Sequence, residues 1–216
     1  MNVRRLLREP AHQIAPRLLG AQLRSYSDHG DVVARIVEVE AYGGADEDPG
    51  SHAFRGQTPR NNTMFGDAGH AYVYFTYGMH WCVNVTTGPA GVAGAVLIRA
   101  AHIVSGLEIA RSRRPGSSDR DLARGPARLA KALAIDGRLD GIDLLAPKSP
   151  LRLALAGPAE SWSTSPRTGV GGAGAWIPWR FYLPDEPTVS AYRAHQSKSR
   201  NMSKSRNKGV SRLARE

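Results

Sequence analysis

Cysteine is almost absent from this sequence of 216 residues, because Cys82 is its single thiol. One cysteine excludes a disulfide framework, and it excludes the Cys-based ligand sets of structural zinc sites and of zinc-dependent deaminases. No apolar run approaches the ~20 residues of a membrane-spanning helix, and no signal-peptide core follows the first residues. Walker and Rossmann phosphate-binding loops are missing too, since the glycine-rich segment 170–174 matches neither pattern. We therefore expect a cytosolic protein.

Acidic residues are the second shortage. The chain has 19 Asp and Glu against 29 Lys and Arg, and the formal net charge of +10 favours a polyanionic partner. Residues 195–216 hold seven of the basic residues and one acidic residue, so this tail carries +6 of the total and the body +4. The tail is also poor in apolar residues, so we predict that it is disordered when free. It is either an arm that tethers the chain to DNA or a solubilising terminus without that role.

Long helical patterns are scarce as well, whereas glycine and proline are frequent, at 23 and 14 residues. Alternating and β-branched patterns predict strands at residues 33–42, 71–76, 81–86, 95–99, 151–155 and 179–183. Helices are predicted at residues 10–23, 106–113 and 126–135, and long loops at residues 46–67 and 157–178. We predict an α+β fold: a single domain, residues 1–194, with a curved, mostly antiparallel β-sheet core, peripheral helices and a protruding β-hairpin.

The predicted strand 33–42 ends with an unusual combination of side chains. A strand has a period of two, so Glu38, Glu40 and Tyr42 point to one face while the apolar residues between them point to the other. Carboxylates beside an aromatic ring, directly before a Gly-Gly pair, suit a catalytic pocket that binds a base. The alternative is a half-buried strand with a solvated acidic face, and these ten residues by themselves favour that alternative.

The predicted hairpin, residues 71–86, is rich in aromatic residues. Tyr77 falls at its turn, where a large ring needs something to enter, such as the gap between two DNA base pairs. The alternative is that Tyr77 folds back onto the domain. Tyr72 and Tyr74 are in register on the first strand, and Tyr74 is placed to stack on an extruded base, although such tyrosines more often belong to a core.

A series of segments in a fixed order resembles the alkyladenine (3-methyladenine) DNA glycosylase family, in the class that wedges DNA with a hairpin. The resemblance runs from residue 9 to residue 183 and leaves out the basic tail. The segments that carry it are Glu38-Val39-Glu40-Ala41-Tyr42, Ser51-His52, Gln57-Thr58-Pro59-Arg60-Asn61, Tyr72-Val73-Tyr74, Tyr77-Gly78-Met79, Cys82-Val83-Asn84, Val96-Leu97-Ile98-Arg99, Gly125-Pro126-Ala127-Arg128-Leu129, Arg167-Thr168-Gly169-Val170-Gly171 and Arg180-Phe181-Tyr182.

The resemblance implies a catalytic pair and a reaction. Glu40 matches the general base that activates a water, and Arg99 matches the arginine that helps to hold the carboxylate and the water. Val170 matches a position whose backbone carbonyl places that water. The implied enzyme flips alkylated or deaminated purines out of duplex DNA and hydrolyses the N-glycosidic bond. No lysine stands at the matched positions, so we expect a monofunctional glycosylase that leaves an abasic site and uses no metal or organic cofactor.

The resemblance also implies a pocket for the extruded base. Tyr42, His52 and Tyr74 match the side chains that sandwich the base, and Asn84 matches a floor residue that disfavours the exocyclic amine of guanine. Tyr77 matches the wedge that fills the vacated stack. The implied partner is double-stranded DNA that contains damaged purines, bound by a monomer with no membrane association. The implied location is the bacterial cytoplasm, in association with the nucleoid, or the nucleus of a eukaryote.

Three other interpretations compete with this one. The same aromatics would serve a non-catalytic module that recognises distorted DNA or structured RNA. A hydrolase of free nucleosides would need neither Tyr77 nor the basic tail. A protein-interaction domain is a third alternative, and the intact Glu40 and Arg99 pair argues against it. A metal site built from Asp48, His52 and His70 is not expected, because their spacing is irregular.

Overall fold

Two long antiparallel strands, β2 (Val32–Tyr42) and β5 (Ala95–Ser105), form the centre of the sheet in the computed structural model, which describes residues 2–157 and 159–196. The main path of the sheet runs β3-β4-β5-β2-β1-β6. The other strands on that path are β1 (Gln22–Ser25), β3 (Ala71–Thr76), β4 (His80–Thr86) and β6 (Leu151–Ala154). Off the path, β8 (Arg180–Tyr182) pairs with β2 next to the stretch that pairs with β1, and β7 (Ser163–Ser165) pairs with β8.

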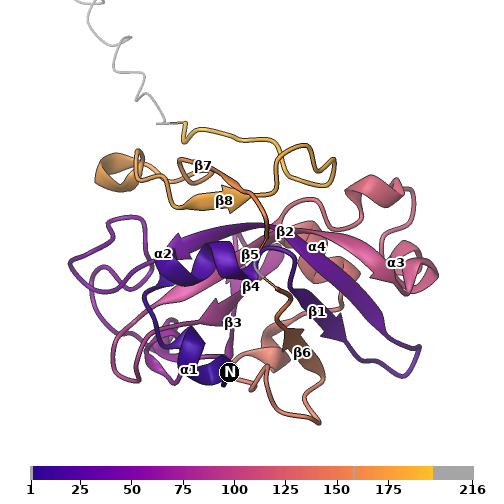
Figure 1. Ribbon diagram of the computed structural model, residues 1–216, viewed down its shortest axis with the longest axis horizontal. Helices are drawn as coiled ribbons and strands as arrows, with labels where there is room; N and C mark the ends of the chain where they lie inside the picture. The colour runs from indigo at the N-terminus through magenta and orange to yellow at the C-terminus, as the bar shows by residue number, and fades with distance from the viewer. Residues whose placement is uncertain (1, 158, 197–216) are drawn as a thin grey trace, which may run out of the picture.

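Every pairing between these strands is antiparallel, and the helices around the sheet are short (Figure 1). This confirms the predicted α+β domain. The α-helices are α1 (Val3–Leu7), α2 (Ala11–Ile14), α3 (Leu107–Arg113) and α4 (Pro126–Ala132). Short 3-10 helices lie between them: η1 (Ala15–Leu18), η2 (Asn62–Phe65), η3 (Asp119–Asp121), η4 (Gly137–Leu139) and η5 (Gly172–Gly174).

The predicted helix at residues 10–23 is wrong in its extent. α2 ends at Ile14, η1 follows, and the chain is already in β1 from Gln22. Pro16 has no N–H to continue an α-helical ladder, and Gly20 takes φ +82, which ends the helical stretch before the strand. The prediction also missed β1 and β7, which are four and three residues long and too short for a clear alternation.

The ends of two other elements differ from the prediction. The helix predicted at residues 126–135 stops at Ala132, because Ala134 turns into the left-handed region with φ 53. The strand predicted at residues 95–99 continues to Ser105, because β5 is paired with β2 again beyond Arg99, as far as Ser105. The hairpin of β3 and β4, with Tyr77 and Gly78 at its turn, lies where it was predicted.

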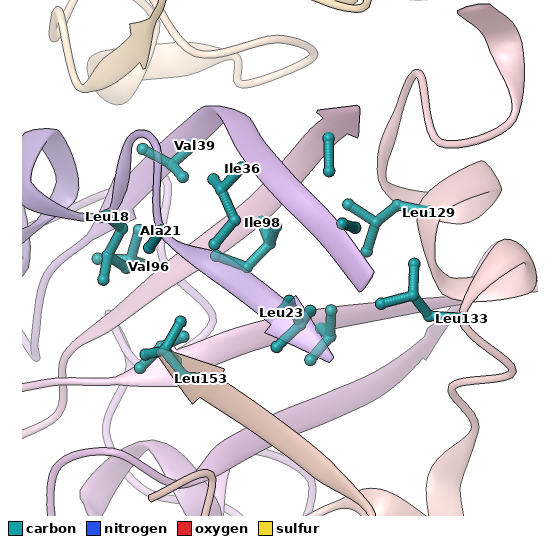
Figure 2. Close-up of a cluster of buried hydrophobic side chains, with 14 of the residues drawn as sticks. Leu18, Ala21, Leu23, Ile36, Val39, Val96, Ile98, Leu129, Leu133 and Leu153 are labelled. Atoms are coloured by element: carbon teal, nitrogen blue, oxygen red, sulfur yellow. The ribbon is translucent and has the colours of Figure 1, made fainter. Parts of the chain in front are cut away.

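The core lies against one face of the sheet. Figure 2 shows side chains from β1, β2, β5 and β6 meeting side chains of η1 and α4. On β2 the core residues are Val32, Ala34, Ile36, Val39 and Ala41, so the alternation changes phase between Ile36 and Val39. The opposite face of β2 is buried as well, and it carries Glu38 and Glu40. A strand that is buried on both faces leaves no solvated acidic face, so that alternative is wrong.

Two further predictions concern the basic tail and the absence of membrane-spanning helices. Of the tail predicted to be disordered, residues 197–216 lie outside the described residues, so the prediction stays a prediction. Within the described part of the chain, the helices are too short and too polar to cross a membrane.

Candidate active site

Two β-bulges shape the middle of the β2–β5 pair. Val37 is an extra residue in β2 and Arg99 is an extra residue in β5, and neither has a partner in the ladder between these strands. Because there is one insertion on each strand, the register is the same on both sides of the two bulges. Bulges redirect side chains, and here they place the Arg99 guanidinium against the carboxylates of Glu38 and Glu40. The catalytic pair predicted from the sequence is therefore together.

Glu40 is fully buried and accepts three hydrogen bonds. Its Oε2 accepts from the Tyr42 hydroxyl at 2.8 Å and from Arg99 Nη1 at 3.3 Å, and its Oε1 accepts from the Thr168 backbone N–H at 2.7 Å. Burial and the neighbouring charge of Glu40 raise the pKa of Tyr42 well above its usual value, so this phenol stays a donor. Burial would lower the pKa of Arg99, but the charges of Glu40 and Glu38 outweigh it and raise that pKa.

Glu38 is equally buried but has a different set of partners. Its Oε1 accepts from Arg99 Nε at 3.0 Å, from Arg180 Nε at 2.6 Å and from the Ser190 hydroxyl at 2.9 Å. Its Oε2 accepts from the Ser190 backbone N–H at 2.8 Å. Sequence reasoning placed Glu38 on the same face as Glu40 but gave it no role. The period-two pattern was the available signal, whereas Arg180 and Ser190 are more than 140 residues away in the chain.

A second buried ion pair supports the pocket from behind. Arg167 and Asp48 have fully buried side chains and form two hydrogen bonds of 2.6 Å, and Arg167 Nη1 also donates to the Ala41 carbonyl at 2.9 Å. The guanidinium carbon of Arg167 lies 4.7 Å from the ring centroid of Tyr42. Burial by itself would raise the pKa of Asp48, but Arg167 holds it below its usual value. From the sequence, Arg167 was only part of a matching segment, and its pairing with Asp48 was not predicted.

A cavity of about 510 Å³ opens beside Glu40 and Arg99, the predicted catalytic pair. Its lining contains seven of the eight residues predicted for the site: Tyr42, His52, Tyr74, Tyr77, Asn84, Arg99 and Val170. The eighth, Glu40, lies directly behind this lining, because three of its neighbours, Tyr42, Arg99 and Thr168, form part of the wall. The structure thus brings all the predicted site residues to one place, and the volume is in the range of small-molecule sites.

The aromatic wall of the cavity is electrically neutral. The His52 ring meets the edge of Tyr74 at a centroid distance of 4.7 Å, and its Nδ1 lies 3.0 Å from the Tyr72 hydroxyl. Burial lowers the pKa of His52, and it raises the pKa of Tyr72 to about 12 and that of Tyr74 further. Asn84 Nδ2 donates to the Tyr72 carbonyl at 2.9 Å, which fixes the amide at the cavity wall. Such a wall suits a flat ring.

The residues considered for a metal site point elsewhere. Asp48 is paired with Arg167, His52 faces Tyr72, and His70 Nδ1 lies 3.0 Å from the backbone carbonyl of Asp67. Among residues 2–157 and 159–196, no group of three or more His, Cys, Asp or Glu side chains is arranged to hold a metal ion.

The turn of the hairpin presents its aromatic ring outward. Tyr77 is 87% exposed and takes φ 51, and Gly78 follows with φ 66, so two successive residues are in the left-handed region. That region is strained for a tyrosine and unstrained for glycine. Phe75 and Met79 on either side are exposed as well. The alternative in which Tyr77 folds back onto the domain is therefore wrong, and an apolar tip stands at the rim of the cavity.

A buried carboxylate–arginine pair, an aromatic cavity and an exposed aromatic ring at its rim are the features expected of a hydrolase that excises bases from nucleic acid. The comparisons with known proteins agree. A family model described as methylpurine-DNA glycosylase matches residues 5–187. The chain therefore belongs to the methylpurine-DNA glycosylase family, a family of DNA glycosylases, which hydrolyse N-glycosyl bonds.

Relatives in three bacteria are each called "Putative 3-methyladenine DNA glycosylase". The protein of Leifsonia xyli is 56% identical over 190 residues, which are 85% of this chain and 88% of the relative. That of Streptomyces avermitilis is 49% identical over 201 residues, which are 91% and 94% of the two chains. That of Nocardia farcinica is 55% identical over 186 residues, or 83% and 85%. The predicted family is thus confirmed over most of the chain.

Proposed function

We propose that the protein excises alkylated or deaminated purines from duplex DNA. Glu40 activates a water that hydrolyses the N-glycosidic bond, and the product is an abasic site. The observation that carries this proposal is the buried Glu40–Arg99 pair directly behind an aromatic cavity. The names of the bacterial relatives support an alkylated purine as substrate.

The surroundings of Glu40 fit the role of a base. A carboxylate offers about four lone-pair sites, and Tyr42, Arg99 and Thr168 occupy three of them, so one remains for the proton of a water. The hydrogen bonds from Arg99, from the Thr168 N–H and from the Tyr42 hydroxyl hold the carboxylate in one orientation toward the cavity wall. As the glycosidic bond breaks, the sugar acquires oxocarbenium character, and the nearby carboxylate stabilises that charge. The carbonyl of Val170, on the same wall, helps to place the water.

The cavity accounts for selection of the base. Tyr42, His52 and Tyr74 enclose the extruded ring, and a cationic ring such as that of 3-methyladenine gains a cation–π attraction on the order of 1–2 kcal/mol on tyrosine faces. Asn84, held by the Tyr72 carbonyl, disfavours the exocyclic amine of guanine. Tyr77 at the exposed turn enters the stack and replaces the base that has left.

The proposal is tested by base release from duplexes that contain one hypoxanthine or one ethenoadenine, and from methylated DNA, with abasic sites revealed by alkali. We expect release by the wild type and about 10²–10⁴-fold slower release by Glu40→Gln. Glu108→Gln, which removes an exposed carboxylate on α3, is the matched control and keeps the wild-type rate. Tight binding of all three substrates without release would show a recognition module instead. Equal release by Glu40→Gln would remove Glu40 as the base.

The type of product is tested with borohydride. The described residues that line the cavity include no lysine, so they offer no amine for a Schiff base. We expect no covalent enzyme–DNA adduct after reduction and no strand cleavage before alkali. A trapped adduct would contradict a monofunctional reaction.

A further inference from the structure

The segment that follows β8 crosses the back of the catalytic pair. We call residues 188–195 the C-terminal strap; the family match ends just before it, at residue 187. The strap is attached at Ser190, whose N–H and hydroxyl both donate to Glu38, and whose carbonyl accepts from Arg180 Nη2 at 2.9 Å. Arg124 Nε donates to the neighbouring Val189 carbonyl at 2.9 Å. The strap is therefore hydrogen-bonded to the buried Glu38 and Arg180 as well as to residues nearer the surface.

The strap then continues along the cavity. Arg193 and Ala194 form part of the cavity lining. The Arg193 carbonyl accepts from the Gly169 N–H at 2.9 Å, and the His195 ring lies 3.2 Å from the Gly169 carbonyl. Gly169 lies between Thr168, which donates to Glu40, and Val170, which lines the cavity. The strap therefore braces the segment that completes the site opposite β2.

The contacts of Arg99 link the strap to the chemistry. Its three guanidinium nitrogens have three different partners: Nε donates to Glu38, Nη1 to Glu40 and Nη2 to the Ser190 hydroxyl at 3.4 Å. A guanidinium is planar, so fixing Nε and Nη2 fixes the direction of Nη1. The Ser190 hydroxyl contacts both Arg99 and Glu38 and is thus the one strap side chain placed to set this orientation.

We propose that the C-terminal strap is a wall of the base pocket and that Ser190 is a positioning residue that aims Arg99 at Glu40. This inference rests on the proposed glycosylase reaction. Ser190 touches no reacting atom; it acts through Arg99. The strap contributes to selection of the base, because Ala194 is part of the cavity lining.

The positioning role is tested by single-turnover base release with saturating enzyme. Ser190→Ala is expected to slow release about tenfold, because a misaligned Arg99 no longer holds the Glu40 carboxylate in place. Ser190→Thr keeps a hydroxyl and should restore most of the rate. A merely structural serine would leave the rate unchanged.

Ser25→Ala is the matched control for folding. The Ser25 hydroxyl is buried and donates to the Leu133 carbonyl at 2.6 Å, far from the cavity lining. Its loss should lower the melting temperature at least as much as Ser190→Ala does, with the release rate kept within twofold of the wild type. Equal rates for Ser190→Ala and Ser25→Ala, or no rescue by threonine, would overturn the positioning role.

The wall is tested at Ala194, where only the size of the side chain is varied. Val104→Trp, which adds the same bulk at an exposed residue outside the cavity lining, should keep the wild-type rate on all substrates within about twofold. Ala194→Trp should slow release of the bulky ethenoadenine more than that of hypoxanthine, with binding to undamaged duplex kept. Equal slowing of both bases, or none, would show that the strap is no wall of the pocket. If the wild type releases no base at all, the proposed function fails; if it does and the strap variants behave like it, only this inference fails.

Discussion

Glu38 and Glu40 lie two residues apart on one face of β2, both fully buried and both bound by Arg99. Their surroundings nevertheless differ. Glu38 has two arginines and a serine that donates twice, and it does not line the cavity. Glu40 has a single arginine, a phenol and a backbone N–H, and all three of these neighbours form part of the cavity wall. Burial and residue type do not separate the structural acid from the proposed catalytic one; the position of their partners relative to the cavity does.

The largest expected difference between the two acids is in stability, when each is replaced by glutamine. Glu38→Gln leaves Arg99 and Arg180 buried with one fewer negative charge, and removing one partner of a buried pair lowers the free energy of unfolding by about 3–5 kcal/mol. Glu40→Gln keeps Arg99 paired with Glu38, so we expect a loss of about 1 kcal/mol. Urea unfolding of both variants measures the difference. Equal losses would mean that the two acids support the fold alike.

Tyr42→Phe should sharpen the comparison by removing one donor from Glu40 and none from Glu38. The hydroxyl donates to Oε2 of Glu40, so without it the carboxylate is held less firmly. Because the pKa of Tyr42 is raised well above its usual value, the alkaline limb of the pH–rate profile should stay where it is. The optimum rate should fall about tenfold. Tyr26→Phe, at a half-buried tyrosine outside the cavity lining, controls for loss of a phenol. An unchanged optimum rate would contradict the direct effect on Glu40.

Tyr77→Ala should have the smallest effect on the fold, because this ring is outside the network that joins the two acids. We expect no change in the melting temperature and a base-release rate from duplex DNA lower by about 10- to 100-fold, since unstacking involves a few kcal/mol. Phe75→Ala tests whether any exposed ring of the hairpin serves equally well. Release from a free nucleoside that is unaffected by Tyr77→Ala would favour a nucleoside hydrolase.

The sequence predicted those parts of the site that depend on local alternation. Glu40 and Tyr42 share a face because a strand has a period of two, and Tyr77 is at a turn because Gly78 follows it. The bulges at Val37 and Arg99 were out of reach, since an extra strand residue looks like any other until its partner strand is paired. The role of Ser190 was hidden for a related reason: its contact with Glu38 joins residues 152 positions apart.

The predicted helix at residues 10–23 shows a different limit, because here the local pattern itself was misleading. Residues 10–23 have a helical apolar stripe, but Pro16 and Gly20 end the helical hydrogen bonding, and the apolar pattern does not reflect these backbone effects.

The sequence predicted the position of the long loop at residues 46–67 but not its structural role. Asp48 turns out to anchor that loop to Arg167 beneath the Tyr42 ring, through a pair of residues 119 positions apart.

The two bulges also bear on how this chain could change in length. Val37 and Arg99 have no partner in the ladder, so deleting either residue removes a bulge while the neighbouring pairs, Ile36 with Ala101 and Val39 with Ile98, can still form. Deleting Val37 would keep the arginine, whereas deleting Arg99 would leave Glu38 and Glu40 without the guanidinium that contacts both.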